Sequence, residues 1–505
     1  MIKRSIIVLI SLILIQTLVF SQDYAKIHQL IIEGIDAVYD VDLQTALTKF
    51  QEAKKTAPND LRGPFFEATI YFWKAMLSRN KDEFETYMNL SDKIVEHCEN
   101  VIDKNDNDLD AKLYLGWTYT MRAFIMGFLG ENYLKAASEI KDGSENLKYI
   151  IEKNPNYYDA YLGLGVYNYL LSFIPRKLQW ATAILGFSGD RDEGKRMLTI
   201  ASEKGVYTSS EAKFYMTILL WREENYPLAE SYATSLKNKY PRSPAVWMLW
   251  GGLLSQQDKM TEAIDAYEKS LEYNKGKESD IIFRTAYGAL GTAYFRLNIF
   301  DKAVEYGKRY INYLIKDQNM NNRLHSIGVS LELLGNRNDA LEYYGKARTD
   351  FKDDNDWERF WLRKLKQREA NPITRTDSLL IVADNNRSVG RLNNALADYN
   401  SLITAANQNY SDDIKIQINH GLALTYYKQK DYNKAIELFK SNLALNPANE
   451  KWLVPEACFQ IGRCYMRLGN RDEAKKYFDK TEEYDYDYDF KGSMDQKIKN
   501  ELSKQ

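Results

Sequence analysis

The histidines, the side chains best suited to acid–base chemistry near neutral pH and to metal binding, are few and scattered. The chain contains four histidines, which are His28, His97, His325 and His420. They do not have the short spacing that places two metal ligands on one helix face or in one loop. An acidic run at 482–489 lacks the glycine turn and the final glutamate of a calcium-binding loop. The sequence therefore predicts no metal site.

The three cysteines, Cys98, Cys458 and Cys464, do not form a disulfide framework. Cys458 and Cys464 are six residues apart on an expected helix, so their side chains point to different faces. We expect buried free thiols. The chain also has no glycine-rich phosphate loop, nucleophile elbow or zinc-protease helix. We predict a non-enzymatic protein with no cofactor and no small-molecule substrate; an enzyme with a hidden carboxylate pair is the third alternative.

Binding chemistry is better represented, in a set of aromatic and basic residues near the C-terminus. This set is Tyr427, Lys428, Phe459, Arg463 and Arg467. Aromatic and arginine side chains anchor interfaces because they bury a large area or donate several hydrogen bonds. We predict that these five residues contact a protein or peptide partner. In the alternative interpretation, Arg463 and Arg467 lie four apart on a solvated helix face beside acidic neighbours.

Helices must position these residues, and the stretch 243–275 contains one complete helix–turn–helix unit. Ser243 caps and Pro244 opens its first helix. At helical spacing, the two helices carry Trp247, Trp250, Gly251 and Leu254, and then Ala263, Tyr267 and Leu271. This order of large and small residues resembles the tetratricopeptide repeat, whose period is near 34 residues. Such a unit cannot bury its apolar face alone, so neighbouring units are expected on both sides.

The resemblance implies an all-α fold, a right-handed superhelical solenoid in which the first helix of each repeat lines a concave groove. The groove positions lie one and five residues after the leading large residue, and Phe459 and Arg463 occupy them in the last unit. Chaperone-docking members of the family place Lys and then Asn there. That pair is absent from these positions here, so a clamp for a peptide carboxylate is not expected.

About eleven units can be aligned along the chain. We predict a signal peptide at 1–21, an N-terminal solenoid at 22–351, an irregular helical linker or hinge at 352–376, C-terminal repeats at 377–485 and a polar tail at 486–505. The signal peptide is expected because a short cationic start precedes an apolar run and a small residue, Ser21. The run is short for a membrane span, so cleavage is favoured over a retained anchor.

One unit contains an insertion at 173–190, and it carries a narrower resemblance. Residues 161–198, with Gly-Phe-Ser-Gly-Asp-Arg at 186–191, resemble the tetratricopeptide family that includes the yeast inclusion-body clearance protein. This resemblance implies a binding role at a membrane-linked site. Trp180, Ile184 and Phe187 form the apolar side of a short expected helix. They either pack on the solenoid or contact lipid or a membrane protein.

The net charge of the chain limits the classes of partner that it can bind. The formal net charge is −2 with mixed signs, which gives no electrostatic case for nucleic acid. We therefore predict an exported protein-interaction scaffold of the periplasm or cell envelope that binds a peptide or helix in its groove. The alternative is a membrane-associated assembly or clearance factor that uses the insertion at 173–190. The partner's identity and the oligomeric state cannot be derived from these residues.

Overall fold

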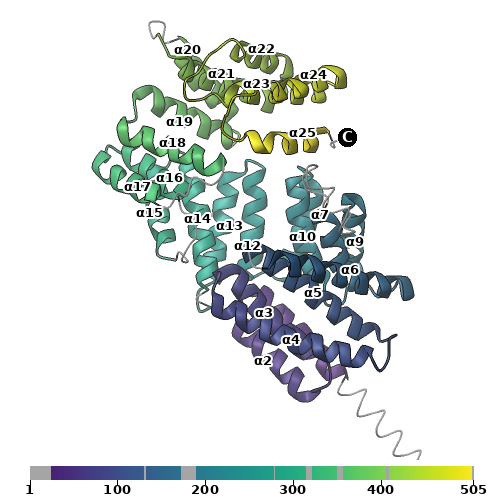
Figure 1. The fold of residues 1–505 in the computed structure, drawn as a ribbon. Coiled ribbons are helices and arrows are strands. Elements are labelled where there is room, and N and C mark those ends of the chain that lie inside the picture. The colour runs from purple at the N-terminus through teal and green to yellow at the C-terminus, as the bar shows by residue number, and fades with distance from the viewer. Residues whose placement is uncertain are drawn as a thin grey trace, which may run out of the picture. The chain divides into compact units, whose positions relative to one another are not determined.

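The computed structural model describes residues 24–129, 132–171, 189–277, 279–313, 321–349, 356–404 and 409–502. Within these ranges the secondary structure consists of helices and turns (Figure 1), which confirms the all-α fold class. The chain forms two compact units. The first contains the described residues up to 253 and those of 268–283, and the second contains 254–267 and 284 onward. The predicted signal peptide and the insertion residues Trp180, Ile184 and Phe187 lie outside the described ranges.

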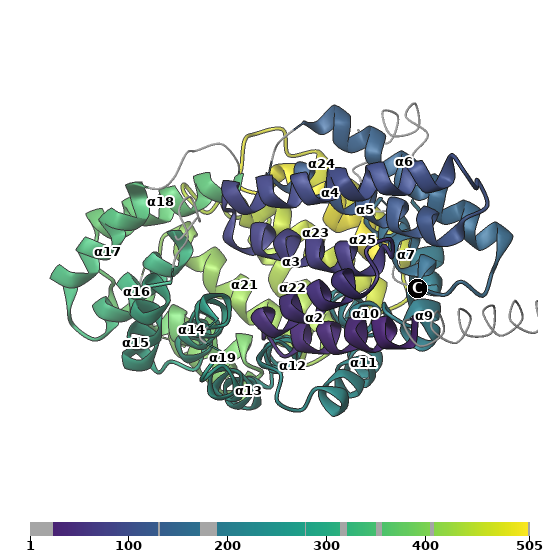
Figure 2. The same ribbon diagram turned by 90° about the horizontal axis from the view of Figure 1, so that it is seen from below.

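The first unit begins with a helix at 24–39. It continues with α2 (Leu43–Thr56), α3 (Arg62–Ser78), α4 (Lys81–Ile102), α5 (Leu109–Leu129), α6 (Tyr133–Lys153), α7 (Ala160–Leu171), α9 (Arg191–Lys204), α10 (Ser209–Arg222), α11 (Tyr226–Lys239) and most of α12 (Pro244–Gln256). Helices that follow each other along the chain pack together, as Figure 2 shows for α2, α3 and α4. This nearest-neighbour packing is that of a stack of helical repeats.

The second unit contains part of α13 (Met260–Tyr273) and most of α14 (Asp280–Arg296). It continues with α15 (Phe300–Ile311), α16 (Asn321–Leu333), α17 (Arg337–Thr349), α18 (Asp356–Ala370), α19 (Arg375–Ser388), α20 (Leu392–Thr404), α21 (Asp412–Lys428), α22 (Tyr432–Asn442), α23 (Leu453–Arg467), α24 (Arg471–Glu482), the short 3-10 helix η1 (Lys491–Ser493) and α25 (Met494–Leu502). Part of the predicted polar tail is thus the helix α25.

Several hairpins place a glycine of the first helix against an aromatic ring sixteen residues further on. The pairs are Gly34 with Phe50, Gly328 with Tyr344, and Gly462 with Phe478. A Cβ atom on Gly462 would lie 2.4 Å from the ring of Phe478, which is closer than two carbon atoms can approach. The glycine is needed because the bare backbone lets the second helix approach while its ring stays buried.

Local chemistry also explains the turns inside the hairpins. Lys430 and Gly469 end α21 and α23 in the left-handed region, with φ of 65° and 76°. An Asp or Asn follows and caps the next helix: the Asp431 carboxylate accepts a hydrogen bond from the Lys434 amide at 3.2 Å, and Asn470 caps α24 in the same way. These short turns hold consecutive helices side by side.

The predicted linker at 352–376 contains a helix, α18, that packs on α16 and α17. Thr374 and Asp377 form a reciprocal capping box at the start of α19, so a new helix begins at Arg375, three residues after Pro372. A role of this segment as a hinge stays a prediction.

In the first unit, the N-terminal hairpin contacts residues far along the chain. Tyr240 Oη donates to Asp36 Oδ1 at 2.8 Å, and Tyr207 Oη contacts His28 Nδ1 at 2.9 Å. Arg62 Nη1 donates to Tyr207 Oη at 3.2 Å. His28 therefore has a structural partner in a tyrosine. Among the described residues, no helix of either unit is long and apolar enough to span a bilayer.

Candidate partner-binding groove at the C-terminal repeats

Three of the predicted binding residues share one face of α23. Phe459, Arg463 and Arg467 are four residues apart, so their side chains align along the helix. Phe459 is buried, while the side chains of Arg463 and Arg467 retain 19% and 29% exposure. The two arginines therefore remain at the surface, next to a buried ring.

Tyr427, at the end of α21, joins this face from the preceding repeat. The guanidinium of Arg463 lies over its ring, 4.8 Å from the centroid, and Arg467 Nε donates to Tyr427 Oη at 3.2 Å. A cation–π contact holds the planar guanidinium in place while its N–H groups donate to other acceptors. The fold thus brings together four of the five predicted residues.

Lys428 has other partners. Its Nζ pairs with Asp258 Oδ2 at 2.7 Å and donates to the carbonyl oxygen of Arg387 at 3.2 Å. The lysine is thus engaged in a contact within the second unit that joins residues 170 positions apart. Its predicted contact with a partner is not tested by this arrangement, but the ammonium already has two acceptors.

The face formed by Tyr427, Phe459, Arg463 and Arg467 is in contact with α25, the last helix that the structure describes (Figure 1). The Glu501 carboxylate lies between the two arginines, with Oε2 at 3.3 Å from Arg463 Nε and Oε1 at 3.2 Å from Arg467 Nη2. The side chain of Glu501 is only 4% exposed. This face, which we call the groove from here on, therefore holds a helix of its own chain through a nearly buried carboxylate.

Sequence reasoning missed the acidic half of this groove. Glu456, on the first turn of α23, accepts a hydrogen bond from Lys497 of α25 at 3.0 Å and one from Gln460 at 2.8 Å. Burial would raise the pKa of Glu456, but Lys497 and His420 outweigh it, so the pKa is lowered. The signal was available: Glu456 lies three residues before Phe459, on the same helix face.

His420 of α21 is the histidine nearest to this groove. Burial lowers its pKa to about 4, although the neighbouring carboxylate of Glu456 acts in the opposite direction. Its ring packs against Phe439 at 5.3 Å, and its Nδ1 is buried without a hydrogen-bond partner. The imidazole is therefore neutral at pH 7. In the part of the chain that the structure describes, no three His, Cys, Asp or Glu residues are grouped as metal ligands.

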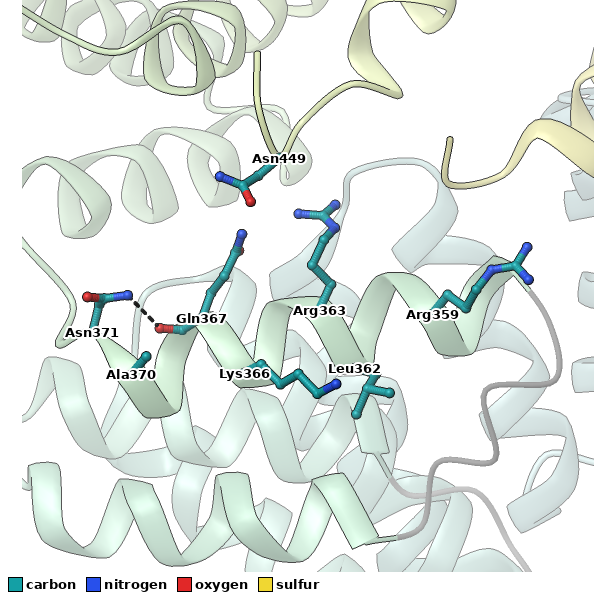
Figure 3. A pocket seen from close by; sticks show the side chains of 8 residues that line it. All are labelled: Arg359, Leu362, Arg363, Lys366, Gln367, Ala370, Asn371 and Asn449. Atoms are coloured by element: carbon teal, nitrogen blue, oxygen red, sulfur yellow. Dashed lines mark hydrogen bonds between the residues drawn. The ribbon is translucent and has the colours of Figure 1, made fainter. Parts of the chain in front are cut away.

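An open hollow of about 480 Å³ lies along α18. Figure 3 shows its lining, with the side chains of Arg363 and Gln367 pointing from α18 toward Asn449. Arg363 pairs with Asp489 at 2.6 Å and with Glu450 at 3.1 Å. Because carboxylates of the chain already neutralise this arginine, the hollow does not require an added anion.

Hairpins of this period, with a glycine of one helix against a ring of the next, are typical of tetratricopeptide repeats. A tetratricopeptide repeat model matches residues 426–490, which include all five predicted groove residues. The chain therefore contains tetratricopeptide-type repeats in this segment, as the sequence predicts. The model of the Iml2/Tetratricopeptide repeat protein 39 family matches residues 159–279, which confirms the resemblance seen at 161–198 and extends it.

A curated relative is the tetratricopeptide repeat protein ttc-39B of Caenorhabditis elegans. It is 22% identical over 249 residues, which cover 40% of this chain and 43% of the relative. The chain thus spans less than half the length of that protein.

Similar solved structures include YrrB, described as a TPR protein with an unusual peptide-binding site (16% identity, 45% of this chain and 96% of that chain, TM-score 0.21). Another is NprR with its cognate peptide NprX (13% identity, 58% and 82%, TM-score 0.25). A third is the human IFIT1 dimer with m7Gppp-AAAA (12% identity, 92% and 95%, TM-score 0.36). These similarities do not assign a ligand to this chain.

Proposed function

We propose that this protein is a non-catalytic scaffold that binds a peptide or helix of a partner protein in the groove of its C-terminal repeats. One observation carries the proposal: the face of α21 and α23 with Tyr427, Phe459, Arg463 and Arg467 holds a helix, α25, through two arginine–carboxylate contacts. A face that binds one helix in this way has the shape and donors needed to bind another.

Recognition would depend on side chains that are already in position. Arg463 is held by the ring of Tyr427 and donates to Gln460 Oε1 at 3.1 Å, so little rotational freedom is lost when a carboxylate binds. Glu456 supplies the opposite charge at the other end of the face and can select a basic residue. The stacked repeats keep α21 and α23 in register, which preforms the surface.

A charge-reversal experiment tests this function. The full chain with Arg463→Glu and Arg467→Glu is compared with wild type after in-cell crosslinking, affinity recovery and quantitative mass spectrometry. We expect at least a tenfold loss of the recovered partner. The matched control reverses Arg471 and Lys475, two exposed residues of α24 with the same spacing. Equal recovery from the groove variant, the control and wild type would refute the groove as the binding site.

The second candidate function is that of a membrane-associated assembly or clearance factor. It is favoured by the match at 159–279, because the matched segment contains the whole insertion at 173–190. In this case Trp180, Ile184 and Phe187 would contact lipid or a membrane protein. Deletion of 173–190 would then release the chain from the membrane fraction, whereas the Arg463/Arg467 variant would remain bound.

We also propose export of the chain by residues 1–21, with function in the periplasm or cell envelope. The support is the pattern of a cationic start, an apolar run and the small residue Ser21. N-terminal sequencing of the purified protein tests this: cleavage predicts a first residue of Gln22, and an intact Met1 would contradict it.

A further inference from the structure

The last helix, α25, is seated in the groove by three chemically different contacts along one face. Met494 is buried and, with Ile498, packs in a cluster with Phe459 and Phe478. Lys497 pairs with Glu456 at 3.0 Å, and Glu501 pairs with Arg463 and Arg467. An apolar residue, a cation and an anion thus follow one another along α25, and each meets its complement on the repeats.

The charge order also fixes the direction of the bound helix. Along α23, the acidic Glu456 precedes Arg463 and Arg467; along α25, the basic Lys497 precedes Glu501. A helix that bound in the opposite direction would place like charges together. Because Glu501 is only 4% exposed, a wrong charge there would be nearly buried, and a missing one would leave the two partly exposed arginines without their carboxylate.

α25 is attached to the rest of the chain by fewer buried residues than the repeat helices are. α25 has nine residues and fully buries only two of them, Met494 and Glu501. Helices shorter than roughly 12 residues are marginal in water without packing. Much of the attachment is therefore electrostatic, and salt weakens contacts of this kind where the groups are partly exposed, as Arg467 is.

The segment before α25 is anchored independently. Asp489 pairs with Arg363 at 2.6 Å, and the ring of Phe490 packs against Phe360 and Trp452. Gly492 lies two residues after Phe490 and donates its amide to Asp356 Oδ2 at 3.0 Å. Residues 494–502 can therefore leave the groove while the chain up to Phe490 stays in place, and they return from a short tether.

We propose that α25 is a displaceable internal ligand of the groove, and that the partner displacing it is an amphipathic helix with an apolar residue, a Lys three positions later and a Glu four positions after that. This inference rests on the proposed function of the groove and specifies its partner. Full occupancy of the groove by a partner requires release of α25, so α25 restrains binding.

The test uses the full chain with Lys497→Glu and Glu501→Lys, which places like charges between α25 and the groove. The probe is a fluorescent peptide of residues 491–505 added in trans, with affinity measured by anisotropy at low salt. The peptide is expected to bind this variant at least tenfold more tightly than wild type, because the internal competitor is removed. A matched control, Asp495→Asn with Lys499→Gln, removes one charge of each sign outside the groove contacts without reversing the charges at the ends of α25, and its peptide affinity should stay well short of the tenfold change.

A second measurement does not depend on the variants. In the wild-type chain, amide hydrogen exchange of 494–502 should be at least tenfold faster than that of α23, and it should accelerate with salt while α23 does not change. Absence of peptide binding to the charge-exchange variant, or exchange of α25 only together with α23, would overturn the inference. If the Arg463/Arg467 variant still loses its partner in that case, the groove function stands and only the role of α25 fails.

Discussion

Replacing Glu450 by Gln should weaken the contact between α18 and the C-terminal repeats. Glu450 lies in the loop before α23, and its side chain is 4% exposed. Its carboxylate pairs with Lys364 at 2.5 Å and Arg363 at 3.1 Å, and it accepts a hydrogen bond from Trp452 Nε1 at 3.0 Å. Glutamine keeps the size of the side chain and removes its charge, so Lys364 loses its carboxylate and Arg363 keeps only Asp489.

The magnitude follows from the pKa of the carboxyl group. Burial alone would raise the pKa of Glu450, but Lys364 and Arg363 outweigh burial and lower it from 4.5 to about 2. A difference of this size is worth about 3 kcal/mol of folding free energy at pH 7. The folded pKa is below the unfolded one, so this stabilisation is complete above about pH 5. It is lost as the pH falls toward 2, with about 2 kcal/mol already lost at pH 3.

Hydrogen exchange of peptides from α18 and from 449–454 measures the effect locally, without assuming two-state unfolding. At pH 7, exchange in the Glu450→Gln variant should be about a hundredfold faster than in wild type. The control, Glu437→Gln, removes an exposed carboxylate of α22 and should leave exchange unchanged. A change below threefold at pH 7, or an equal change in the control, would refute the electrostatic reasoning.

Two further predictions concern the first and the second unit. Burial raises the pKa of Glu211 from 4.5 to about 7, although a hydrogen bond from Tyr215 acts in the opposite direction. The folded pKa is above the unfolded one, so the stability of the first unit is highest below about pH 4.5 and falls as the pH rises through 7. Glu211→Gln should therefore stabilise the first unit by roughly 3 kcal/mol at pH 8 and by almost nothing at pH 4 in urea titrations, and equal effects at both pH values would contradict this. Gly462→Ala should cost about 1–3 kcal/mol because its methyl group meets the ring of Phe478. The control Gly127→Ala, where a Cβ meets no atom within 4 Å, should be neutral or slightly stabilising by the same titration.

The repeat architecture and the residues of one helix face could be predicted from the sequence because the information is local. A glycine and an aromatic residue sixteen apart predict a hairpin, and Phe459, Arg463 and Arg467 share a face by helical spacing alone. Tyr427 could be added because consecutive repeats place equivalent helices side by side. These predictions needed only the periods of the helix and of the repeat.

The contacts of Lys428 and of Glu501 could not be predicted in this way. Asp258 is 170 residues from Lys428, and Glu501 is 38 residues from Arg463 across a non-repeating connection. No period links such positions, so only the folded chain shows that a lysine is engaged elsewhere and that a tail helix lies on the arginines. The amphipathic pattern of Met494, Lys497 and Glu501 was nevertheless present in the predicted polar tail.

Because Lys428 is paired with Asp258, fewer charged groups are left to select a partner helix in the groove. With that ammonium paired, the charges that face α25 are Glu456 at one end and Arg463 with Arg467 at the other. A partner must then present a cation and an anion in this order, on one face of a helix. If α25 occupies the groove about 90% of the time, the apparent affinity of such a partner is reduced about tenfold, since only the open fraction binds. The tenfold gain expected for the Lys497/Glu501 variant is therefore a direct measure of how often the internal helix is seated.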